Sequence, residues 1–193
     1  MRVADPSSVE SFVKTLADDS RARPAVGFPS GHGRVDVAGM YSWWADPQSL
    51  EMMREELSEE IPALIYVGQS GATRWPSGAP SSATLTSRIR TNHLNGNASS
   101  STFRLTVSAL LVGPLGLSIA KAGRLIPADR VFVSAWIKEH LSVLTVPFSD
   151  RDALGSLENR VLETLDPPFN LKGMRPTSVR NRLAKLRRVI SSP

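Results

Sequence analysis

Glu158 is the residue whose position in the sequence suggests chemistry most directly. A helix is expected from Asp150 to about Leu165, and at about 100° per residue its leucines and its valine gather on one side. Glu158 falls inside this apolar arc, whereas Glu163 points to the opposite side. A carboxylate on an apolar face is costly unless it has a hydrogen-bond partner, a cation or a metal ion. The pattern leaves two interpretations: an acid at the edge of the stripe that pairs with a buried arginine, or a functional carboxylate.

Two tyrosines lie next to glycines in apolar, strand-like segments. Tyr41 ends the sequence Gly-Met-Tyr at 39–41, and Tyr66 begins the sequence Tyr-Val-Gly at 66–68. A tyrosine on a strand is usually a core residue whose hydroxyl is hydrogen-bonded. Neither tyrosine alone therefore indicates a site.

The segment 84–94 is expected to be a helix that carries Arg88, Arg90 and His93. On an ideal α-helix Arg88 and His93 diverge by about 140°, whereas Arg90 and His93 are neighbours three residues apart. Either His93 lies past the end of the helix or Arg90 shares the functional role. We favour Arg88, because it borders the apolar face of this helix, and keep Arg90 as the alternative.

These residues are expected to lie on a mixed order of strands and helices. Apolar and β-branched runs bounded by Pro and Gly predict strands at 35–44, 63–68 and 141–148. Helical spacing and capping residues predict helices at 9–16, 46–61, 84–94, 99–111, 129–139, 150–165 and 177–190. The order indicates an α/β fold of the α+β type, with a small central sheet and helices around it.

The composition limits the class of protein further. The chain has 193 residues, enough for one compact domain, and no cysteine, which excludes disulfides, thiol nucleophiles and cysteine-bound metals. No apolar run approaches membrane-spanning length, and the first residues lack the apolar stretch of a signal peptide. We expect a cytoplasmic protein that has no membrane partner.

Charge is distributed unevenly along the chain, whose net charge is +5. The segment 51–60 is rich in glutamate, whereas every charged residue from Lys172 to the end is basic. A basic stretch of this kind is the electrostatic footprint expected for a polyanionic partner. A solvated helix is the alternative interpretation.

Taken together, the order of these motifs resembles the GIY-YIG nuclease family. Gly-Met-Tyr and Tyr-Val-Gly are followed by a helix with arginine and then histidine, and later by a helix with one acid in its apolar stripe. The segments 93–98 and 101–104 also resemble those that follow this helix in some bacterial members. So does the ending 157–170, an acid-bearing helix that leads to Pro-Pro-Phe-Asn. The resemblance covers roughly residues 37–172.

The resemblance implies a fold and a division of the chain. The fold it implies would be a small three-stranded antiparallel sheet flanked by helices. Residues 35–172 would form the nuclease-like domain, with an insertion at about 46–62. Residues 1–34 would be an N-terminal extension and 173–193 a basic C-terminal helix.

The resemblance also implies a site for phosphodiester hydrolysis. Glu158 would be the sole protein ligand of one divalent cation, Mg²⁺ or alternatively Mn²⁺. Tyr41 would be the general base toward the attacking water, assisted by His93. The remaining residues would stabilise charge on the phosphate, orient the water or a phosphate oxygen, and brace the site: Arg88, Tyr66 and Asn170, respectively.

The expected partner is DNA, with RNA not excluded. Backbone phosphates would be contacted by basic residues, namely Arg90, Arg104, Arg180, Lys185, Arg187 and Arg188. Two alternatives stay open: a nucleic-acid-binding module with an inactive site, and a protein-interaction domain that docks through the acidic segment 51–60. Restriction, repair and junction cleavage are equally compatible with the sequence, and so is any oligomeric state.

One departure from the compact family pattern concerns the spacing of the two tyrosines. Residues 42–65 separate them, about twice the compact spacing. The excess contains the acidic segment, and the restriction-enzyme branch of the family also carries long spacers here. The departure therefore affects the subtype more than the chemistry.

Overall fold

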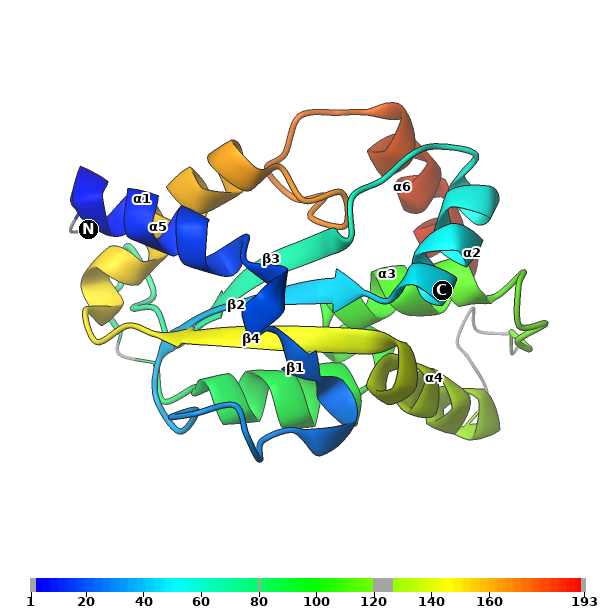
Figure 1. Cartoon of the computed structure of the whole chain (residues 1–193), viewed down its shortest axis with the longest axis horizontal. Helices are drawn as coiled ribbons and strands as arrows, with labels where there is room; N and C mark the ends of the chain where they lie inside the picture. The colour runs from blue at the N-terminus through cyan, green and yellow to red at the C-terminus, as the bar shows by residue number, and fades with distance from the viewer. Residues whose placement is uncertain (1–2, 80, 120–126, 192–193) are drawn as a thin grey trace.

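The computed structural model describes residues 3–79, 81–119 and 127–191. An antiparallel sheet in the order β1-β4-β2-β3 runs through the molecule (Figure 1). Its strands are β1 (Arg23–Pro24), β2 (Gly39–Ala45), β3 (Leu64–Ser70) and β4 (Leu141–Pro147).

The sheet has four strands, so the expectation of three is wrong by one strand. The long strands β2, β3 and β4 correspond to the three expected ones. The additional strand, β1, has two residues and pairs with Ser142 and Val143 of β4. A pair of residues is too short to produce an alternating pattern of apolar and polar side chains, which is why the sequence did not reveal it.

The helices agree in order with the expected ones. Side-chain caps begin several of them, as at Asp5, Asp46, Ser101 and Asp150. The long helices are α1 (Pro6–Leu16), α2 (Pro47–Leu57), α3 (Thr102–Leu111), α4 (Pro127–His140), α5 (Arg151–Leu165) and α6 (Ser178–Ser191). The short ones are η1 (Asp19–Arg21), η2 (Ala25–Gly27), η3 (Ser87–Leu94) and η4 (Ala98–Ser100). In this described part of the chain no helix has the length and apolar character to span a membrane.

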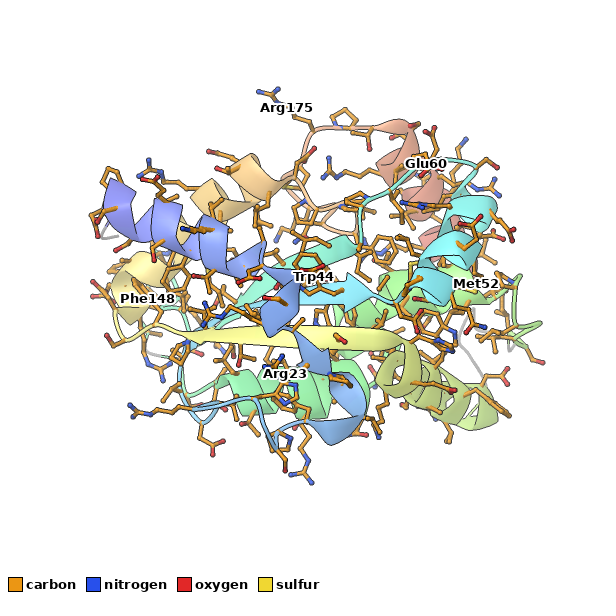
Figure 2. The ribbon with its side chains drawn as sticks, viewed as in Figure 1. Arg23, Trp44, Met52, Glu60, Phe148 and Arg175 are labelled. Atoms are coloured by element: carbon orange, nitrogen blue, oxygen red, sulfur yellow. The ribbon has the colours of Figure 1, made fainter. Side chains whose placement is uncertain are left out.

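Helices cover both faces of the sheet. On one face, α1 and α5 pack together over Met40 and Leu144, and Phe148 meets Phe12 of α1 edge to face, with ring centroids 5.4 Å apart (Figures 1 and 2). On the other face, Trp43 stacks on Phe103 of α3 at 4.6 Å. Helices η3, α3 and α4 cover this second face, and α6 packs against α3. Side chains that alternate along β2 therefore enter two separate cores.

Candidate active site

The two glycine–tyrosine motifs lie side by side on neighbouring strands. Tyr41 of β2 is paired with Gly68 of β3, and Trp43 is paired with Tyr66. Paired residues of antiparallel strands share a face, so both tyrosines point toward η3 and α3. Their rings are nearly parallel, with centroids 6.4 Å apart and an interplanar angle of 28°.

Both glycines of these motifs are required by close approaches. A Cβ at Gly68 would lie 2.6 Å from the hydroxyl oxygen of Tyr41, so the tyrosine ring occupies the space that any other side chain would need. A Cβ at Gly39 would collide with the carbonyl oxygen of Val146 on β4. Gly68 therefore makes room for Tyr41, and Gly39 allows β2 and β4 to approach each other.

The segment 84–94 was expected to be an α-helix, but its main part, η3, is a π-helix. Its hydrogen bonds join residues five apart, as where the Asn95 N–H donates to the Arg90 carbonyl at 3.1 Å. Residues five apart therefore lie on one side, and the 140° divergence expected for Arg88 and His93 does not occur. π-Helical turns are rare in proteins, and those that do occur are often found at functional sites.

Arg88 and His93 both reach the hydroxyl group of Tyr41. Nε2 of His93 lies 2.8 Å from the Tyr41 hydroxyl oxygen, and Nε of Arg88 donates to the same oxygen at 3.4 Å. Tyr41 and His93 are fully buried, whereas Arg88 is half-buried and Arg90 is exposed. Of the two arginines left open by the sequence, Arg88 is the one that contacts Tyr41.

Burial controls the protonation of this pair. Desolvation raises the pKa of Tyr41 well above its ordinary value; the neighbouring Tyr66 raises it further and Arg88 opposes the shift. Desolvation lowers the pKa of His93 well below its ordinary value, and the positive charges of Arg88 and Arg104 lower it further. At neutral pH the pair is therefore a protonated phenol beside a neutral imidazole.

Glu158 on α5 supplies the carboxylate. It is half-buried, and desolvation raises the pKa of its carboxyl to about 7, opposed by the charge of Arg88 and by a hydrogen bond from the Gln69 N–H. It belongs to no group of three or more acidic or histidine side chains suited to a metal among the described residues. A metal ion here would therefore depend on water or substrate oxygens for most of its ligands.

Asn170 braces the outer edge of β3. Its side-chain Oδ1 accepts from the Val67 N–H at 3.0 Å and its Nδ2 donates to the Val67 carbonyl at 2.7 Å. The neighbouring Phe169 N–H donates to the Ile65 carbonyl at 2.9 Å. The segment after α5 therefore completes the hydrogen bonding of an edge strand that carries Tyr66.

A comparison with known protein families identifies the family to which this chain is related. The model of the GIY-YIG catalytic domain matches residues 39–189, which include both glycine–tyrosine strands, η3, Glu158 and Asn170. The chain belongs to the GIY-YIG nuclease family. No curated protein and no solved structure matches it.

Two of the arginines expected to contact nucleic acid serve the GIY-YIG fold internally instead. Arg104, 1% exposed, donates through Nη1 to the carbonyls of His93 and Leu94 at 3.0 and 3.1 Å. Its Nη2 donates to the carbonyl of Arg130 at 2.7 Å. The expectation of a phosphate contact at Arg104 is therefore corrected: its guanidinium caps the end of η3 and joins it to α4.

Arg180 is the second correction. It is 4% exposed, and its Nε donates to the Asn170 carbonyl at 2.8 Å. Its Nη2 pairs with the Asp166 carboxylate at 2.7 Å and also donates to the Pro167 carbonyl at 3.0 Å. Arg180 thus holds the segment that carries Asn170. In the sequence these two buried arginines look the same as exposed ones. The backbone carbonyls to which they donate come close to them only in the folded chain.

The other basic candidates lie at or near the surface. Arg90, Lys185 and Arg188 are exposed. Arg187 is half-buried, and its Nη2 donates to the Thr102 carbonyl at 2.9 Å. These four side chains, from η3 and α6, remain the expected phosphate contacts of this GIY-YIG domain.

Sequence reasoning missed Ser101 and Thr102. The Ser101 hydroxyl lies 2.7 Å from Nδ1 of His93, and a hydrogen bond with Thr102 lowers the pKa of Tyr66, which burial raises overall. The available signal was segment 101–104, which resembles the family, but no role in the site was predicted for its serine or its threonine. Ser101 does cap α3, and the same hydroxyl also contacts the site.

Proposed function

We propose that this chain is a metal-dependent endonuclease that hydrolyses phosphodiester bonds in DNA with one Mg²⁺ held by Glu158, Mn²⁺ being the alternative cation. The observation that carries the proposal is the hydrogen-bonded Tyr41–His93 pair with the Arg88 guanidinium at the same hydroxyl, together with the electrostatic interaction of Arg88 with the Glu158 carboxylate. Phosphodiester hydrolysis needs a group that takes the proton of the attacking water, and positive charge at the phosphate. The family match over residues 39–189 supports the same chemistry.

Glu158 fits Mg²⁺ by its chemistry. A carboxylate is a hard oxygen donor, and Mg²⁺ commonly binds one or two carboxylates, several waters and substrate phosphate. Burial raises the pKa of Glu158 to about 7, and a nearby cation favours the ionised form and offsets that cost. When bound, the ion would polarise a phosphoryl oxygen and stabilise charge on the leaving oxygen.

Tyr41 and His93 move the proton of the attacking water. Burial raises the pKa of Tyr41, so a free tyrosinate does not accumulate at neutral pH. The Tyr41 hydroxyl oxygen therefore takes a proton from water while its own proton passes to Nε2 of His93, 2.8 Å away. The lowered pKa of His93 keeps the ring neutral beforehand, with one nitrogen able to accept this proton.

The remaining side chains position the phosphate and the strands. Arg88, half-buried beside Tyr41, places positive charge where the phosphate becomes more negative. Tyr66, stacked beside Tyr41, orients the water or a phosphate oxygen. Asn170 keeps the strand of Tyr66 in place through its two hydrogen bonds with Val67.

The basic surface supports a nucleic-acid substrate. Arg90 on η3 and Lys185 and Arg188 on α6 are exposed, and Arg175 points outward from the segment between α5 and α6 (Figure 2). Cations at such positions contact phosphates without reading sequence. Binding is expected to weaken steeply with salt as counterions are released.

Plasmid cleavage tests the proposal. Supercoiled plasmid is incubated with the wild type and with Glu158→Ala, each with Mg²⁺ or with EDTA. We expect nicking or linearisation that requires Mg²⁺ and disappears in the variant. Glu163→Ala, an exposed acid on the same helix, is the matched control. Salt-sensitive binding without cleavage by any of the proteins would overturn the nuclease proposal in favour of a binding module.

A further inference from the structure

Ser101 contacts the side of His93 that faces away from Tyr41. Its hydroxyl oxygen lies 2.7 Å from Nδ1 of His93 and accepts the Arg104 N–H at 3.0 Å. Ser101 is 2% exposed and His93 is fully buried. Tyr41, His93 and Ser101 therefore form one continuous hydrogen-bonded chain, assembled from β2, η3 and the start of α3.

The hydrogen count explains why this contact matters. When His93 accepts the Tyr41 proton at Nε2, its ring becomes a cation with hydrogens on both nitrogens. The Nε2 hydrogen faces the Tyr41 oxygen, and the Nδ1 hydrogen needs an acceptor at a place that water does not reach. The Ser101 oxygen lies in that position. A buried donor without an acceptor would slow this transfer by roughly 10–100-fold.

We propose that Ser101 is a positioning residue for proton transfer: its hydroxyl accepts the Nδ1 hydrogen of His93 while Nε2 takes the proton of Tyr41. The inference rests on the proposed nuclease function. In the step, one proton moves from water to Tyr41 and one from Tyr41 to His93. The water oxygen bonds to phosphorus as the bond from phosphorus to the leaving oxygen breaks. The leaving oxygen takes a proton from solvent. His93 then returns its proton to Tyr41, which releases the proton that it took from water to solvent.

A hydroxyl suits this position better than a carboxylate. The titratable and charged groups around His93 include Tyr41 and Tyr66 on the sheet, Arg88 on its own helix and Arg104 on α3. The two arginines favour the neutral imidazole. A carboxylate at position 101 would counter them and protonate His93 at rest, which would leave Nε2 unable to accept. The neutral hydroxyl accepts the Nδ1 hydrogen in both states of the ring, so it keeps Nε2 free to accept at rest and still serves the cation when it forms.

The test uses substitutions that separate the hydroxyl from the helix cap. Ser101→Gly removes the hydroxyl but keeps most of the capping, because glycine is a tolerated N-cap. Ser101→Thr keeps both. We expect single-turnover plasmid nicking with Mg²⁺ to fall roughly 10–100-fold in the glycine variant and to stay within about threefold of wild type in the threonine variant. Asp5→Gly, the same kind of change at the N-cap of α1 outside the site, controls for the small loss of capping alone.

Two further measurements read His93 directly. Ser101→Asp should raise the pKa of His93 and move the acid limb of the pH–rate profile to higher pH. The ¹⁵N chemical shifts of the His93 ring should change in the glycine variant, and this readout does not depend on cleavage. Unchanged rate, pH profile and ring shifts in the glycine variant would overturn the role of Ser101. A wild type that never cleaves but whose ring shifts respond to the glycine variant would overturn the nuclease proposal and, with it, the relay, while keeping the contact.

Discussion

Arg88 and His93 both contact the hydroxyl group of Tyr41, because the i→i+5 hydrogen bonds of η3 bring residues five apart onto one side of the helix. The arginine donates from 3.4 Å and the imidazole nitrogen lies at 2.8 Å. An α-helix would have turned one of the two away. The π-helical winding thus places a fixed positive charge and a proton acceptor at one oxygen.

This arrangement predicts different effects for the two arginines of η3. Arg88→Ala should lower the cleavage rate by roughly 10²–10³-fold, because it removes a cation directed at the reacting centre. Arg90→Ala, an exposed neighbour, should leave the single-turnover rate within about threefold and reduce the slope of binding against salt by about 1. Equal losses of single-turnover rate in both variants would contradict the assignment.

The raised pKa of Glu158 predicts a pH-dependent effect on stability. Because the folded pKa of about 7 exceeds the ordinary 4.5, the folded state binds the extra proton between these values and stability falls as pH rises through them. At pH 8 without metal, the free energy of unfolding of Glu158→Gln should therefore exceed that of the wild type by on the order of 1 kcal/mol, after allowance for partial exposure. The variant should accordingly unfold at a higher temperature. At pH 4 the difference should vanish. Calorimetry at the two pH values checks this.

Metal addition provides an independent measurement on the same carboxylate. Mg²⁺ should raise the melting temperature of the wild type at pH 8, because an ion that binds the folded state stabilises it by mass action. Glu158→Gln should show no such shift, and Glu163→Gln should behave as the wild type. The increase should reverse with EDTA. A melting temperature of the wild type that does not respond to millimolar Mg²⁺ would argue against an ion at this position.

Gly68 should be needed for the position of Tyr41. Gly68→Ala places a methyl group 2.6 Å from the Tyr41 hydroxyl oxygen, so the ring must shift, at about 1–3 kcal/mol in the free energy of unfolding. Cleavage should fall by at least about 10²-fold, because misplaced catalytic groups lose rate steeply. Gly155→Ala on α5 meets nothing within 4 Å and should instead stabilise by up to about 1 kcal/mol. Denaturant unfolding and plasmid cleavage distinguish the two variants.

Substitution of a buried arginine should change the stability of the fold, whereas substitution of an exposed lysine should change DNA binding. Arg104→Met leaves the carbonyls of His93 and Leu94 without their donor and should destabilise the fold by about 2–4 kcal/mol. Lys185→Ala, which is exposed, should leave stability within about 0.5 kcal/mol and reduce the slope of DNA binding against salt by about 1. Urea unfolding and salt-dependent binding measure the two effects. A stable Arg104→Met protein with weakened DNA binding would reverse the assignment.

The sequence alone determined the family and the three long strands, and it supplied the proposed residues of the candidate site. Strand and helix periodicities are local, and Gly-Met-Tyr, Tyr-Val-Gly and the Glu158 stripe are each readable within a few residues. The same locality explains the order of the helices, since capping residues such as Asp46 and Asp150 lie next to the turns they begin.

Tertiary structure alone decided which side chains meet and which charges are buried. The two-residue strand β1 exists because β4 offers it an edge, and η3 is a π-helix in a position where the sequence predicted an α-helix. Arg104 and Arg180 have the same local appearance as exposed arginines, yet carbonyls from distant segments hold them inside. The Ser101–His93 contact depends on how α3 begins beside η3. Such contacts join segments through packing and desolvation, which no local pattern encodes.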